Sequence, residues 1–277
     1  ANVTRGQMAA FVVRAENTLN NEVPGTDEVV VEGNNVTFTD SDYTNNTITI
    51  GDKTYTYDMS VRPIFTQANK TALNGAKLTV TVADDEIKKV NSITLNKSGV
   101  AAKPVVFTAG DVTVDTLVVN ANYVSVKKLK VTGNANVTNK ATDKVEFTGV
   151  AVTGNIIVDN KGAVAVASLD NKFAQDNKGV EVVLNETTFA NLIFRASATL
   201  SGKANPAVIT VEGVVAVALN LEGTIASLKV TDANAKVTLG ANVKVTTLHL
   251  PAGTKAEDII TNYSAVSGQI GRTVIGN

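Results

Sequence analysis

The sequence predicts an all-β protein: a small β-barrel or sandwich domain followed by a right-handed parallel β-helix, with a short N-terminal helix. Hydrophobic residues make up 44% of the 277 residues, aromatic residues only 5%, and tryptophan is absent, so the core must consist of small aliphatic side chains. Val, Thr and Asn are abundant, which is typical of short strands joined by polar turns. Apolar segments between about residues 105 and 250 recur roughly every 20 residues without helical periodicity.

The first segment, residues 4–16, is patterned as a helix. Thr4 suits the N-cap, and Gln7 three residues later completes a capping-box pattern. The apolar residues that recur at three- and four-residue spacing would form one face: Met8, Phe11, Val12 and Ala15. Pro24-Gly25 then indicates a linker.

Residues 26–98 change to period-two alternation and are predicted to form the small β-domain. Short strands are expected at 29–32, 36–39, 47–50 and 54–58, with a hairpin turn at Gly51-Asp52. A helical piece at 65–73 ends at Asn74-Gly75, and a second hairpin pairs 77–82 with 87–95.

Residues 105–253 are predicted to form the parallel β-helix, because this region repeats itself. KKLKVTGNANV (127–137) aligns with TGVAVTGNIIV (148–158) at an offset of 21 residues. A period near 20 fits coils of short strands that stack around an aliphatic interior, and the Asn residues of the two TGN motifs would then form an amide ladder along the axis. An antiparallel sandwich is the alternative, but it gives no reason for TGN to repeat at a fixed offset.

A looser motif, apolar-x-x-apolar-x-apolar, recurs more widely along the β-helix. Its central residues are expected to point inward: Leu129, Val150, Leu192, Leu228 and Leu248. Residues 254–277 are expected to form a C-terminal cap and tail, because Thr254-Lys255-Ala256-Glu257 is a second capping-box pattern.

Residues 4–15, TRGQMAAFVVRA, resemble the closing helix of an S-layer homology (SLH) module, whose usual form is close to T-R-A-E-x-A-x-h-h-x-R-A. The phrases ITIGDKTY and LNGAKLTVTV are similar in style to regions downstream of such modules in surface proteins of Bacillus- and Paenibacillus-like Gram-positive bacteria. The resemblance implies that residues 1–18 are the remnant helix of the last SLH module. The chain would then be the distal part of a longer surface protein.

In that family, three SLH modules together hold a pyruvylated cell-wall polysaccharide, with the Thr-Arg pair of each module among the contacts. Only Thr4 and Arg5 carry over here, as vestigial wall-polysaccharide-binding residues. Gly6-Gln7 departs from the usual Ala-Glu, and one helix cannot bury its apolar face alone. Binding to the wall polysaccharide is therefore expected only through the missing SLH modules.

The residues do not indicate catalysis, so we expect no enzyme, no cofactor and no catalytic or metal site. The acids of the β-helix are scattered along it: Asp111, Asp115, Asp143, Glu146, Asp159 and Asp170. Asp143 and Glu146 could share a turn, but a solvated turn explains them better than the carboxylate pair that glycoside hydrolysis needs. Arg195 is the only arginine of the β-helix, and the single histidine, His249, is expected to point outward from a strand.

Calcium is possible at two acidic stretches but unsupported, because hairpin acids explain them better: Asp40-Ser41-Asp42 and Asp84-Asp85-Glu86. Several Asn-x-Ser/Thr sequences, among them those at Asn35, Asn69, Asn136 and Asn185, reflect an Asn- and Thr-rich composition more than glycosylation.

The sequence therefore favours a structural cell-surface protein, an S-layer or surface-fibre subunit that self-assembles and projects from the cell wall. Its expected location is extracellular, in the cell wall or S-layer, and its expected partners are further copies of itself. A formal net charge of -1 offers no basic field for nucleic acid, and no apolar run is long enough for membrane insertion. The alternatives are a glycan-binding or glycan-degrading β-helix protein, or an adhesin.

Overall fold

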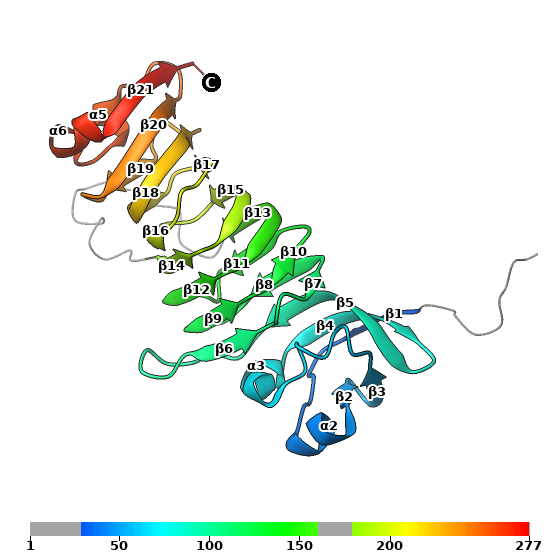
Figure 1. The fold of residues 1–277 in the computed structure, drawn as a ribbon. Coiled ribbons are helices and arrows are strands. Elements are labelled where there is room, and N and C mark those ends of the chain that lie inside the picture. The colour runs from blue at the N-terminus through cyan, green and yellow to red at the C-terminus, as the bar shows by residue number, and fades with distance from the viewer. Residues whose placement is uncertain (1–28, 160–178, 277) are drawn as a thin grey trace, which may run out of the picture.

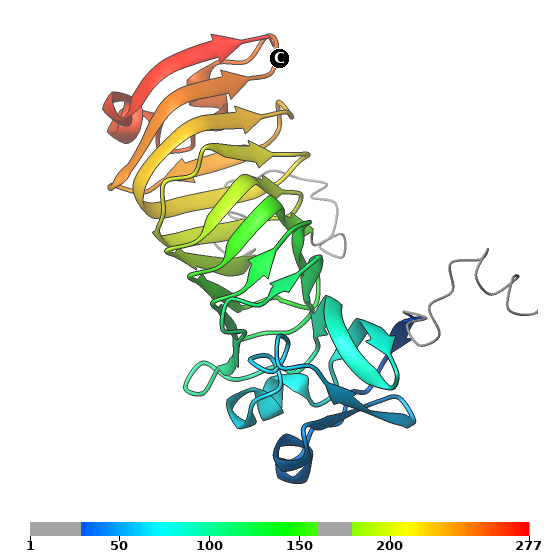
Figure 2. The same ribbon diagram turned by 45° about the vertical axis from the view of Figure 1, so that its right-hand side comes forward.

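The computed structural model describes residues 29–159 and 179–276. The fold is all-β, with 55% strand and 10% helix, and consists mainly of a right-handed β-solenoid of about 7 turns. Its coils stack along one axis from the N-terminal region, blue and cyan in Figure 1, to the C-terminal region in red, and Figure 2 shows the same stack from a second side. The prediction of a parallel β-helix is confirmed.

The N-terminal end of the solenoid is covered by residues 29–95. Its elements are β1 (Val29–Gly33), α2 (Asp40–Asn45), β2 (Thr47–Ile50), β3 (Lys53–Tyr57), η1 (Gln67–Asn69), α3 (Lys70–Leu73), β4 (Lys77–Ala83) and β5 (Glu86–Leu95). β4 and β5 form the expected hairpin, β1 pairs with β4, and β5 pairs in parallel with the solenoid strand β8 (Thr116–Val119). Because these strands continue into a solenoid sheet and share its hydrophobic core, a separate barrel or sandwich at 26–98 is not confirmed.

The first half of this end region differs from the sequence prediction at residues 36–42. The strand expected at 36–39 is reduced to one bridge between Thr37 and Thr49. Asp42 accepts a hydrogen bond from the Thr39 N–H (2.8 Å), and the Asp42 N–H donates to the Thr39 hydroxyl (3.1 Å). This capping box starts helix α2, so the prediction that Asp40 and Asp42 belong to a hairpin is wrong.

One sheet, here named the long sheet, extends over the whole stack. In spatial order its strands are β1, β4, β5, β8, β11 (Ala135–Thr138), β13 (Ala151–Asp159), β15 (Thr188–Phe194), β17 (Val208–Val211), the second half of β18 (Ala216–Val230), β20 (Val243–Leu250) and β21 (Ile270–Ile275). A continuous row of fully buried side chains crosses it: Leu78, Ile93, Leu117, Ala135, Ile156, Leu192, Ile209, Leu228 and Leu248.

A second sheet, here named the short sheet, faces the long sheet across the core. Its strands are all parallel: β6 (Val105–Thr108), β9 (Val124–Lys127), β12 (Lys144–Thr148), β14 (Val180–Asn185), β16 (Ala198–Lys203), the first half of β18 and β19 (Lys236–Leu239). Two short strands, β7 (Thr113–Val114) and β10 (Lys130–Val131), form part of a third side with the start of β13. Aliphatic side chains fill the interior together with a few phenylalanines, as the low aromatic content predicts.

The offset of 21 residues is confirmed as the register of two neighbouring coils. Val131 lies beside Val152, and Val137 lies beside Val158. The five residues predicted to point inward are also buried, and at most 1% of the surface of each residue is exposed: Leu129, Val150, Leu192, Leu228 and Leu248.

The looser motif nevertheless gives a wrong neighbour at Leu192. Leu192 stacks on Ile156, whereas Thr188 lies beside Ala151 and its N–H donates to the Val150 carbonyl (2.9 Å). The reason is that coil length varies: Val145 pairs with Val124 on one side and with Val182, much farther along the chain, on the other. A fixed period cannot follow such a change.

The TGN motifs lie where the backbones of adjacent coils approach closely. A Cβ atom on Gly154 would lie 2.4 Å from the Gly133 carbonyl oxygen, so only glycine fits. The amide ladder predicted for the two asparagines is wrong, since the Asn134 side-chain oxygen accepts from the backbone N–H of Asn155 (2.9 Å). An asparagine here bonds to the main chain of the next coil.

The C-terminal cap is present, with a shifted start. It contains α5 (Ala256–Ile259), α6 (Tyr263–Val266) and η2 (Ser267–Gln269), followed by β21. The N-cap is Lys255, whose N–H donates to Asp258 (2.9 Å), while the Thr254 hydroxyl donates to Pro251 (2.8 Å). The tail after the cap supplies the last strand of the long sheet.

Candidate functional site

Asp143 and Glu146, the pair considered for glycoside hydrolysis, each engage neighbouring hydroxyl groups. The Thr142 hydroxyl donates to Asp143 (3.3 Å), and the Thr148 hydroxyl donates to Glu146 (3.1 Å). In the part of the chain that the structure describes, no group of three or more His, Asp or Glu side chains could hold a metal ion. Asp170 lies outside the described residues.

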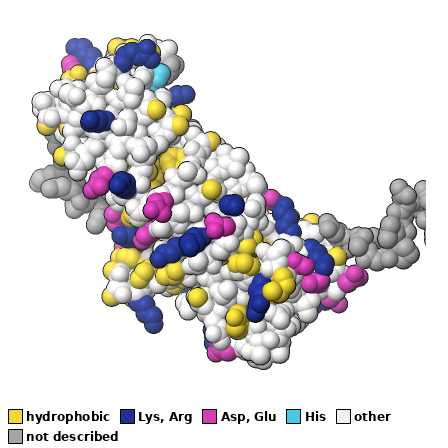
Figure 3. Space-filling model, in the orientation of Figure 1, with side chains coloured by type: hydrophobic (Ala, Val, Ile, Leu, Met, Phe, Trp, Pro, Cys, Tyr) yellow, Lys and Arg dark blue, Asp and Glu magenta, His cyan; other side chains and the backbone are white. Residues whose placement is uncertain are grey.

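Other charged side chains of the solenoid form ion pairs on its surface. Lys89 contacts Asp115 (2.8 Å) and lowers the pKa of that carboxyl by donating hydrogen bonds to it. Arg195 contacts Glu212 (2.7 Å), and this hydrogen bond raises the pKa of Arg195, so the guanidinium cannot serve as a base. Figure 3 shows that positively and negatively charged side chains are interspersed on the face that it displays.

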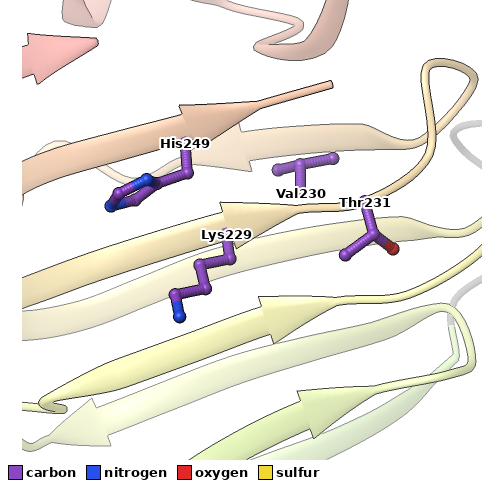
Figure 4. A pocket seen from close by; sticks show the side chains of 4 residues that line it. All are labelled: Lys229, Val230, Thr231 and His249. Carbon is purple, nitrogen blue, oxygen red and sulfur yellow. The ribbon is translucent and has the colours of Figure 1, made fainter. Parts of the chain in front are cut away.

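His249 lines a depression of about 290 Å³ with Lys229, Val230 and Thr231. Figure 4 shows the His249 and Lys229 side chains projecting to the same side from neighbouring strands. The Thr231 hydroxyl donates to the Val211 carbonyl (3.2 Å), and His249 Nδ1 has no hydrogen-bond partner among the described residues. Among the described residues that line this depression, none is a carboxylate that could orient the imidazole, as acid–base catalysis by histidine usually requires.

The acidic stretches considered for calcium carry local partners. Asp85 contacts Lys53 (2.5 Å), and Glu86 forms an ion pair with Lys88. Asp84 and Asp85 have positive φ angles of 51° and 58° in the turn between β4 and β5, so the prediction of hairpin acids is confirmed there.

The ends of the short sheet are closed by two asparagine side chains that sequence analysis did not single out for this role. At the N-terminal end, the Asn69 amide donates to the Thr108 carbonyl (2.8 Å) and accepts from the Thr108 N–H (2.8 Å). At the C-terminal end, the Asn262 amide donates to the Leu239 carbonyl (2.8 Å) and accepts from the Leu239 N–H (3.2 Å). Each amide replaces one residue of a missing neighbouring strand.

The long sheet ends differently. Within residues 29–159 and 179–276, β1 pairs only with β4 and β21 pairs only with β20, so each end presents an unpaired strand edge. Val29, Val30 and Ile275 on these strands are 55%, 63% and 56% exposed. Exposed edge strands are sites at which another strand can add. No local sequence signal marks them, because the strands themselves look ordinary.

The described helices include none with the length and apolarity needed to cross a membrane. Comparison with known proteins found no matching family model, no matching curated protein and no matching solved structure. The proposed wall-polysaccharide residues Thr4 and Arg5 lie outside the described residues. The two open edges of the long sheet are therefore the most distinctive candidate for a functional feature.

Proposed function

We propose that this chain is a structural cell-surface protein, an S-layer or surface-fibre subunit that self-assembles and projects from the cell wall without catalysing a reaction. The observation that carries the proposal is the long sheet, which joins both ends of the molecule and presents an open edge at each. A solenoid whose coils are hydrogen-bonded to one another along one axis can serve as a spacer or as the repeating unit of a lattice.

The extracellular location in the cell wall or S-layer is supported by the resemblance of residues 4–15 to the end of an SLH module. Contact with the wall polysaccharide would require complete SLH modules. Thr4 and Arg5 alone would not hold it, since they belong to one helix of one module.

Self-assembly can be tested with the purified 277-residue chain by sedimentation over a concentration series and by electron microscopy. We expect filaments or sheets whose mass grows with concentration. A chain that stays monomeric at high concentration would refute the assembly proposal.

The alternative glycan-active function can be tested separately. Incubation of the chain with polygalacturonate, alginate or peptidoglycan should release neither unsaturated nor reducing ends. Steady product formation by protein free of contaminating enzymes would replace the structural proposal with a glycan-degrading one, and saturable binding without turnover would indicate a glycan-binding protein.

A further inference from the structure

We propose that the open edge of β21 pairs in parallel with β1 of a second copy, so that the long sheet continues from one molecule into the next. This inference rests on the proposed self-assembly and names its interface. The contact joins different surfaces on the two copies, so its repetition gives an open filament.

The direction of β1 is the one that such a junction requires. β5 runs parallel to the solenoid strand β8, β4 runs antiparallel to β5, and β1 runs antiparallel to β4. Two reversals therefore return β1 to the direction of the solenoid strands. When molecules stack head to tail with the core faces of their long sheets aligned, the two meeting strands must be parallel, and β1 and β21 satisfy this condition.

The register follows from the rows of the long sheet. Gly33 on β1 lies beside Leu78, and Thr273 on β21 lies beside Leu248, so both belong to the inward row that crosses the sheet. Continuing this row across the junction places Gly33 of one copy beside Thr273 of the other.

The adjacent row brings opposite charges together in the same register. At the N-terminal end of this row, Glu32 lies beside Thr79, and Thr79 lies beside Ser92. At the C-terminal end of the same row, Arg272 lies beside Thr247. In-line stacking therefore places Glu32 of one copy beside Arg272 of its neighbour. The Glu32 side chain is 59% exposed in its contact with Lys77, and no salt bridge among the described residues involves Arg272.

The free hydrogen-bonding groups of β21 can be assigned from its last bond. The Gly276 N–H donates to the Leu250 carbonyl (3.2 Å), toward β20. Since successive N–H groups along a strand alternate between its two edges, the N–H groups of Thr273 and Ile275 point to the open edge. The short sheet offers no comparable edge, because Asn69 and Asn262 occupy its two ends.

The first experiment blocks this edge with Thr273→Pro, which removes an outward N–H and no bond to β20. Thr273→Val is the matched control, because it keeps the N–H. Circular dichroism should show both variants folded. In sedimentation and electron microscopy we expect Thr273→Val to form filaments like the unchanged chain, and Thr273→Pro to need at least about a tenfold higher concentration, since it removes a main-chain hydrogen bond and clashes with a pairing strand.

The second experiment tests the register by exchanging the charges. Glu32→Arg and Arg272→Glu should each weaken assembly by about two- to fivefold, the usual range for a cross-strand charge pair. A mixture of the two single variants should recover normal assembly. In every junction between unlike copies, positions 272 and 32 then carry opposite charges, whichever copy contributes β21. A closed dimer formed through two β21 strands would not be weakened by Glu32→Arg, because Glu32 lies on β1, outside that interface.

The outcomes separate the interface from the general function. Filaments of Thr273→Pro at the same concentration as the unchanged chain, a closed dimer, or no recovery in the charge mixture would each overturn the β1–β21 interface while leaving the structural role intact. An unchanged chain that remains monomeric would overturn both.

Discussion

Substitution of Asn69 by alanine should destabilise the protein strongly, because this side chain closes the short sheet from a fully buried position. Its amide group donates to the carbonyl oxygens of Ile64 (2.7 Å) and Thr108 (2.8 Å), and its oxygen accepts from the Thr108 N–H (2.8 Å). Each neutral hydrogen bond contributes about 1 kcal/mol, and a buried partner left unsatisfied costs about 1–3 kcal/mol. Asn69→Ala should therefore lower the free energy of unfolding by roughly 3–5 kcal/mol.

Asn262 provides the matched control at the other end of the same sheet. It makes two analogous bonds to Leu239, but it is only half-buried, so water can replace the lost amide. Asn262→Ala should cost about 1 kcal/mol or less. Urea unfolding followed by circular dichroism gives both values, and amide hydrogen exchange at Thr108 should accelerate in Asn69→Ala. Equal costs for the two variants would refute the view that buried edge closure stabilises this end.

Three other substitutions, one of them with a matched control, test the packing of the coils and one ion pair. Gly154→Ala places a Cβ 2.4 Å from a backbone oxygen of the neighbouring coil and should lower the free energy of unfolding by about 1–3 kcal/mol. The control Gly268→Ala adds a Cβ in open space and should change the free energy of unfolding by less than about 0.5 kcal/mol. Similar urea midpoints for the two variants would contradict this expectation. Val150→Asp buries a charge at a position 1% exposed and should unfold the neighbouring coils, so an unchanged thermal transition would disprove the inward register. Lys89→Met should raise the pKa of Asp115 toward its ordinary value, as followed by NMR titration. Because the Lys89 contact lowers the pKa of Asp115 in the folded state, the contact stabilises the protein at pH values above the unfolded-state pKa of Asp115. This stabilisation is lost as the pH falls through the folded-state pKa, so Lys89→Met should lose less stability over that pH range than the unchanged chain.

The solenoid could be predicted because its strongest sequence signal reflects a direct physical contact. Gly133 and Gly154 recur at an offset of 21 because the backbones of adjacent coils meet there, and a side chain at either position would clash. The alternation of apolar residues then identifies which side chains point inward, as the burial of Val150 and Leu228 confirms.

The ends of the molecule could not be predicted in the same way, because their pairing partners are distant in sequence. β5 has the alternation of any hairpin strand, and nothing in its residues indicates that it pairs with β8 rather than closing a small barrel. Asn69 likewise resembles many other asparagines of this chain. Its role depends on Thr108, 39 residues away, which no local pattern connects to it.

The way in which asparagines join the coils explains why only fragments of the repeat are visible in the sequence. The side-chain oxygens of Asn134, Asn205 and Asn122 accept hydrogen bonds from backbone N–H groups of the following coil, at 2.9, 2.9 and 2.5 Å. Every residue except proline supplies a backbone N–H, so the partner position is free to vary. An amide-to-amide ladder would require asparagine in each successive coil and would preserve a strict repeat. At these three positions, bonds from side chain to main chain join the coils while the sequence of each coil changes, so a regular solenoid can retain only one clear pair of TGN motifs.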